Sequence, residues 1–85
     1  MSKAEKILQK IRNNPRTVSL HDLNHVLTWY GFARRSPRSG SSHTIYTLGR
    51  HQISVPYKRP YVKEVYVQHV LEILHQIDEE KGEQR

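Results

Sequence analysis

The sequence predicts a small α+β domain with the element order α-α-β-β-β-α, in which helices pack on one face of a three-stranded antiparallel sheet. Two observations support this fold class. Apolar residues recur every three or four positions near both ends of the chain, as in helices with one buried face. In the middle, two runs of alternating apolar and polar residues flank Gly49-Arg50, as in a β-hairpin.

Two helices are expected before the sheet. Residues 4–12 place apolar side chains at helical spacing, and Asn13-Asn14-Pro15 should end this helix because proline cannot continue it. Ser19 is a suitable N-cap for a second helix, with Asp22 three residues later in the manner of a capping box. Gly31 suits the left-handed conformation that often ends a helix.

Three strands are expected next. Residues 32–35 are typical of a short strand, and residues 36–42 form a loop rich in serine, glycine and proline. Residues 43–48 and 51–55 form the two arms of the hairpin. Gly49-Arg50 between them suits a type II′ turn, which requires glycine at its first position.

The last element is an amphipathic helix of about four turns that begins after Pro60. Its apolar face consists of Val67, Val70, Leu71, Leu74 and Ile77. From Asp78 to residue 85 we expect an acidic, frayed tail. With neither an internal repeat nor a linker, residues 1–85 are interpreted as a single domain.

The net charge of +6 is unevenly distributed along the chain. Residues 23–63 contain no Asp or Glu. The basic residues of this stretch are Arg34, Arg35, Arg38, Arg50, Lys58, Arg59 and Lys63. A dense positive field attracts polyanions such as nucleic acids; the alternative is a basic surface that only solubilises the domain.

The absence of cysteine excludes disulfides and thiolate metal sites and fits a reducing cytoplasm. Charged residues interrupt the apolar ones at the N-terminus, so no secretory signal is expected. No segment approaches the ~20 apolar residues that a membrane span needs. We therefore expect a soluble, cytoplasmic protein that does not contact a membrane.

The hairpin pattern predicts where His43 points. If Gly49-Arg50 forms the turn, Leu48 pairs with His51, and paired residues share a face of the sheet. The face covered by helices would then carry Tyr46, Leu48, Ile53 and Val55. The opposite, more polar face would carry His43, Ile45, Thr47, Gln52 and Ser54. We expect His43 to be open to solvent beside the arginines.

An exposed histidine on a basic sheet can transfer protons near neutral pH. RNA supplies its own nucleophile, the 2′-hydroxyl, so a histidine with arginine or lysine to stabilise the phosphorane suffices for cleavage without a metal. The alternative is an ordinary surface histidine. His21 and His25 have the spacing of metal ligands on a helix but lack a third ligand nearby, so no metal site and no cofactor are expected.

Three short motifs resemble the HicA toxin family. Residues Gly40-Ser41-Ser42-His43-Thr44-Ile45-Tyr46 are similar to its Gly-Ser-His-x-x-aromatic motif, and Ile53-Ser54-Val55-Pro56 resembles a strand of that family that ends in proline. Residues 58–67 resemble its basic loop and the helix that follows. The resemblance spans about residues 19–77, and residues 4–12 extend beyond the minimal family domain.

The resemblance implies a fold like the double-stranded-RNA-binding domain, ribosome-independent cleavage of mRNA, and neutralisation by a HicB-like antitoxin that covers the active site. His43 occupies the position of the catalytic histidine and would act as general acid or base. The residues expected to hold RNA are Arg34, Arg35, Arg38, Ser41, Ser42, Lys58, Arg59 and Lys63. Arg50, at the hairpin tip, is expected to be a bystander.

Two other function classes stay open on the sequence alone. One is a non-catalytic RNA-binding module of related fold, in which His43 only contacts phosphate or ribose. The other is a protein-interaction domain that uses the C-terminal helix and the tyrosines Tyr57, Tyr61 and Tyr66. For the toxin, the antitoxin partner should be acidic because it must cover a basic face.

Overall fold

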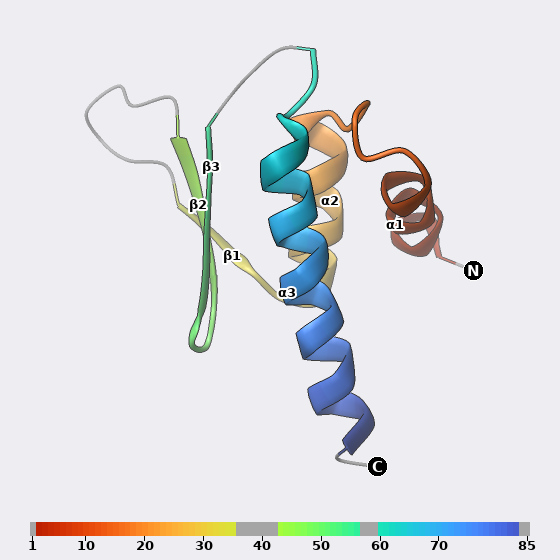
Figure 1. Ribbon diagram of the computed structural model, residues 1–85. Helices are drawn as coiled ribbons and strands as arrows, with labels where there is room; N and C mark the ends of the chain where they lie inside the picture. Colours follow the sequence, from red (N-terminus) through yellow and green to blue (C-terminus); the bar gives the residue numbers. More distant parts are fainter. Residues whose placement is uncertain (1, 36–42, 57–59, 84–85) are drawn as a thin grey trace.

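The structure is a computed structural model that describes residues 2–35, 43–56 and 60–83. Along the chain it contains α1 (Lys3–Asn13), α2 (Leu20–Tyr30), β1 (Ala33–Arg35), β2 (His43–Leu48), β3 (His51–Pro56) and α3 (Glu64–Glu83). This order and the three-stranded antiparallel sheet confirm the predicted α+β class. Figure 1 shows the sheet on one side, α2 and α3 beside it, and α1 on the far side of α2 and α3.

The helix ends follow the predicted capping residues. The Ser19 hydroxyl accepts a hydrogen bond from the Asp22 amide at 3.2 Å and caps the start of α2. Gly31 has a φ of 106°, in the left-handed region, and its amide donates to the carbonyls of Leu27 and Thr28. Helix α1 extends one residue beyond the predicted 4–12 at each end and stops at Asn13, two residues before Pro15.

The hairpin register matches the predicted one. Leu48 pairs with His51, and the pairs continue in step along both strands to His43 and Pro56. Gly49 has a φ of 57°, and among the described residues only glycines have positive φ, so the turn meets the type II′ requirement. Strand β2 is central, with β1 and β3 antiparallel on either side.

One cluster of buried apolar side chains joins the sheet to all three helices. Its fully buried members with under 2% exposure include Leu23 and Leu27 of α2, Ile53 and Val55 of β3, and Val67 and Leu74 of α3. The ring of Tyr46 belongs to the same cluster, and its hydroxyl donates to the Asn24 side-chain oxygen at 2.9 Å. Burying a polar hydroxyl therefore leaves no unpaired donor at this position.

Helix α3 continues beyond the predicted end. The sequence predicted a frayed tail from Asp78 onward, but the helix extends to Glu83, so this expectation is wrong. The reason lies in contacts from distant parts of the chain. Asp78 accepts a hydrogen bond from the Tyr30 hydroxyl and pairs with Arg12, while Glu80 pairs with Arg50 at the hairpin tip. No described helix is long and apolar enough to cross a membrane.

Helix α1 packs on the side of α2 and α3 that faces away from the sheet (Figure 1). Leu8 and Ile11 enter the common core. At its edges, the Lys10 ammonium lies 3.6 Å from the Asp22 carboxylate, and Arg12 lies 3.8 Å from Asp78. Both ion pairs are at least partly exposed, so each stabilises the fold by at most about 1 kcal/mol. The apolar contacts of Leu8 and Ile11 therefore contribute most to the packing of α1.

We expect the contact between Tyr30 and Asp78 to make stability depend on pH in the alkaline range. The pKa of Tyr30 is raised from 10.0 to about 12 by burial first, then by the hydrogen bond and charge of Asp78, against the opposing charge of Arg12. A raised pKa in the folded state means that the neutral phenol stabilises the fold fully below pH 10. This contribution is lost as the pH rises from about 10 to about 12.

Urea denaturation of the parent and of Tyr30→Phe checks this expectation. At neutral pH the free energy of unfolding of the variant should be about 1 kcal/mol lower than that of the parent, because Asp78 loses a hydrogen-bond donor. Between pH 10 and 12 the free energy of unfolding of the parent should fall toward that of the variant. Tyr61→Phe is the matched control, since Tyr61 is 44% exposed. A constant difference between the parent and Tyr30→Phe across this window would contradict the assignment.

Candidate functional site

The hairpin places His43 at the start of β2, on the side of the sheet away from the helices. The next residue, Thr44, pairs with Val55, and both are buried, at 6% and 0% exposure. Because side chains alternate along a strand, His43 must point the other way. Its side chain is exposed, as the sequence predicts.

The surface around His43 is the open face of the sheet. It consists of Arg35, His43, Ile45, Thr47, Gln52 and Ser54, all exposed or half-buried. The opposite face carries Tyr46, Ile53 and Val55, which are buried, and Leu48, which is half-buried. The predicted division of the hairpin into two faces is confirmed. The three strands contain no Asp or Glu, so the open face has no carboxylate of its own.

The register of β1 separates two arginines that the sequence treated alike. Arg35 pairs with Ile45, and Arg34 pairs with Tyr46. Since paired residues share a face, Arg35 belongs to the open face with His43, whereas Arg34 lies on the helix side at the sheet edge. Arg35 and His43 lie on adjacent strands: His43 is two residues from Ile45, the partner of Arg35.

The charge of Arg34 acts on the buried phenol of Tyr46. Burial raises the pKa of Tyr46, and the nearby positive charge of Arg34 opposes this shift. Arg34 is still exposed. Its charge can therefore act on an anion at the edge of the sheet, but it does not share the surface of His43.

Lys63 lies immediately before α3 and is exposed. The preceding residue, Val62, is buried, and its amide donates to the Val18 carbonyl at 2.7 Å. The Lys63 carbonyl accepts the amides of Tyr66 and Val67, which begins the helix. The position of Lys63 is therefore held on both sides. The other expected RNA-binding residues lie outside the described residues: Arg38, Ser41, Ser42, Lys58 and Arg59.

Most carboxylates of the described chain pair with basic residues that do not belong to the open face. Arg16 lies 3.3 Å from Glu64, and Arg50 pairs with Glu80. Within the described ranges, Arg34, Arg35 and Lys63 have no carboxylate partner. Their charge is available to an external anion, whereas Arg50 pairs with Glu80 of α3.

The described residues contain no group of three or more His, Cys, Asp or Glu side chains that could hold a metal ion. His21 is exposed and His25 half-buried on α2. What this surface offers chemically is a solvent-open imidazole near a guanidinium.

Sequence reasoning missed two features of the site region. It did not assign Arg34 and Arg35 to different faces of the sheet. That assignment depends on how β1 pairs with β2, and no local sequence pattern specifies this register. It also missed a pocket between α1 and the ends of α2 and α3, which only tertiary packing creates. Comparison of this chain with known protein families, with curated proteins and with solved structures finds no match.

Proposed function

We propose that this chain is an endoribonuclease of the HicA toxin type, which cleaves mRNA without a metal ion. The observation that carries the proposal is the solvent-open His43 beside Arg35 on a sheet face without carboxylates. Such a face attracts the phosphates of RNA and offers a proton-transfer group in the same place. The short motifs around His43, Ile53 and Lys63 support the same family.

The chemistry follows from the RNA itself. The 2′-oxygen attacks the adjacent phosphorus, and the bond from phosphorus to the 5′-oxygen breaks. The products are a 2′,3′-cyclic phosphate and a 5′-hydroxyl, so no water is consumed. His43 takes the proton from the 2′-hydroxyl or gives one to the departing 5′-oxygen, and Arg35 stabilises the charge that develops on the phosphorane.

The rest of the proposal concerns fold and partner. The α+β arrangement would be a variant of the double-stranded-RNA-binding fold with α1 added at the N-terminus. The further RNA contacts predicted from the sequence would come from Arg38, Ser41, Ser42, Lys58 and Arg59, which lie outside the described residues. A HicB-like antitoxin with an acidic surface would silence the toxin by covering His43 and Arg35, through the same charge complementarity that attracts RNA.

A second candidate is a non-catalytic RNA-binding module. Tyr61 favours it, because this residue is 44% exposed and lies two residues before the exposed Lys63, and exposed aromatic rings in a basic segment suit base stacking. In this function His43 would contact phosphate or ribose without transferring a proton. The two candidates share the binding face and differ only in whether RNA is cut.

An end-labelled structured mRNA incubated with the purified chain in EDTA distinguishes the functions. Cleavage supports the endoribonuclease. Retention of intact RNA that weakens steeply with salt supports the binding module. Absence of both at physiological salt would contradict both RNA functions and favour a protein-interaction domain.

Arg35 and Arg34 should differ in their effect on RNA binding. We expect Arg35→Gln to reduce the slope of log affinity against log salt by about 1, the contribution of one phosphate contact. Arg34→Gln should change this slope less, because Arg34 lies on the other face. Filter binding to an uncleavable RNA with 2′-deoxy substitutions measures both slopes. A larger effect of Arg34 would place the RNA on the sheet edge and contradict binding across the open face.

A further inference from the structure

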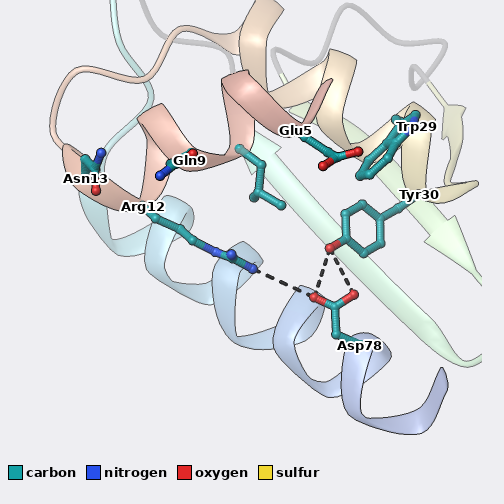
Figure 2. A pocket seen from close by; sticks show the side chains of 8 residues that line it. Glu5, Gln9, Arg12, Asn13, Trp29, Tyr30 and Asp78 are labelled. Atoms are coloured by element: carbon teal, nitrogen blue, oxygen red, sulfur yellow. Dashed lines mark hydrogen bonds and ion pairs between the residues drawn. The ribbon is translucent and has the colours of Figure 1, made fainter. Parts of the chain in front are cut away.

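A pocket of about 540 Å³ lies between α1 and the ends of α2 and α3. Glu5, Leu8 and Arg12 of α1, Trp29 and Tyr30 of α2, and Asp78 of α3 line it, together with two amide side chains of α1 (Figure 2). Its volume falls within the ~300–1,000 Å³ typical of ligand sites. Because α1 packs on the side of α2 and α3 away from the sheet, this pocket is remote from the open face (Figure 1).

One end of the pocket is closed by contacts within the protein. The Tyr30 hydroxyl donates to both Asp78 carboxylate oxygens, at 3.0 and 3.1 Å, and Arg12 lies 3.8 Å from the same carboxylate. These groups stabilise one another across three helices. An incoming ligand would have to break these contacts to reach Asp78.

The other end carries a carboxylate beside an exposed aromatic ring. Glu5 and Trp29 both line the pocket, and Figure 2 shows the Glu5 side chain pointing toward Trp29 and away from Arg12. The Glu5 carboxylate accepts a hydrogen bond from the Ser2 hydroxyl at 3.4 Å, a long contact that leaves acceptor capacity on both oxygens. Trp29 is 49% exposed, although its ring packs edge-on against Tyr30 with centroids 5.4 Å apart.

The local charge is negative in a chain whose net charge is +6. Glu5 and Asp78 carry two negative charges in the pocket against the single positive charge of Arg12. The lysines of α1 lie on another side of the helix, since successive residues turn by about 100°. Lys10, for example, pairs with Asp22 near the start of α2.

We propose that this pocket binds an arginine side chain of a partner protein. The guanidinium would stack on the Trp29 ring and donate to the Glu5 carboxylate, while its apolar stem would contact Leu8. A carboxylate beside an exposed indole suits arginine, which pairs with carboxylates in a planar geometry and stacks on aromatic rings. The site does not depend on the proposed RNA function, and both surfaces can be occupied at once.

Trp29 is the only tryptophan of the chain, so its indole N–H gives one NMR resonance that reports on this pocket. The probe is the blocked peptide acetyl-Leu-Arg-Leu-amide, titrated into the full chain to about 10 mM, ten times a Kd of about 1 mM. The comparison peptide replaces arginine by citrulline, which keeps the shape but carries no charge. We expect a saturable shift with the arginine peptide and at least about tenfold weaker binding of the citrulline peptide.

Two substitutions locate the binding site. Glu5→Gln should lower the affinity for the arginine peptide at least about fivefold. Glu72 is an exposed carboxylate outside the pocket, so Glu72→Gln should leave this affinity unchanged. Circular dichroism of both variants checks that the fold is kept. No shift of the indole resonance, an equal affinity for citrulline, or an equal loss in both variants would each overturn the proposal.

Discussion

A His43→Gln variant is expected to cleave RNA about 10²- to 10⁴-fold more slowly than the parent chain, the usual contribution of one general acid or base. Glutamine retains hydrogen-bonding groups of similar size but cannot transfer a proton at neutral pH. The fold should be unaffected, because His43 is exposed at the start of β2 and does not belong to the buried core. Single-turnover cleavage of a labelled RNA measures the rate.

The matched control for His43 is His69→Gln on α3. His69 is also exposed but does not belong to the open face, so its variant should cleave at the parent rate. RNA affinity separates catalysis from binding: His43→Gln should bind RNA within about fivefold of the parent, since one hydrogen bond contributes about 1 kcal/mol. Equal cleavage by the parent and His43→Gln would show that another group transfers the proton.

Val67→Ala is expected to lower the free energy of unfolding by about 2–3 kcal/mol. Val67 is 0% exposed and belongs to the core beneath the sheet, so truncation removes buried apolar surface and leaves a cavity. The loss is large for a chain of 85 residues, whose total stability is expected to be about 4–13 kcal/mol. Urea denaturation measures this difference, provided that the dependence of the unfolding free energy on urea concentration is the same for the parent and the variant.

Val65→Ala makes the same chemical change two residues earlier on the same helix. Val65 is 67% exposed, so its truncation should change stability by less than about 0.5 kcal/mol, and alanine's higher helix propensity favours a small gain. A similar loss in both variants would contradict the packing of α3 against the sheet.

The hairpin could be predicted in detail because its information is local. Alternation along both arms defines the two faces, and Gly49 defines the turn, so the register and the exposure of His43 followed from a few neighbouring residues. The caps at Ser19 and Gly31 are local in the same sense. These signals act over a few residues and need no knowledge of tertiary packing.

Other features depend on contacts between distant residues and could not be predicted. The last turns of α3 are held by Tyr30 and Arg50, which lie 48 and 30 residues from their acidic partners. The side of the sheet on which Arg35 lies depends on its pairing with Ile45. The pocket at Trp29 requires three helices to converge. In each case the pattern of a single element contains no information about its partner.

The most direct test of the central claim is the chemistry of the RNA ends, measured by mass spectrometry after cleavage in EDTA. If the 2′-hydroxyl is the nucleophile and His43 moves the proton, the products carry a 2′,3′-cyclic phosphate and a 5′-hydroxyl. An RNA with a single 2′-deoxy nucleotide at the cleaved position should then stay intact. Products with a 3′-hydroxyl and a 5′-phosphate, or cleavage at the 2′-deoxy position, would contradict the account because water rather than the RNA would be the nucleophile.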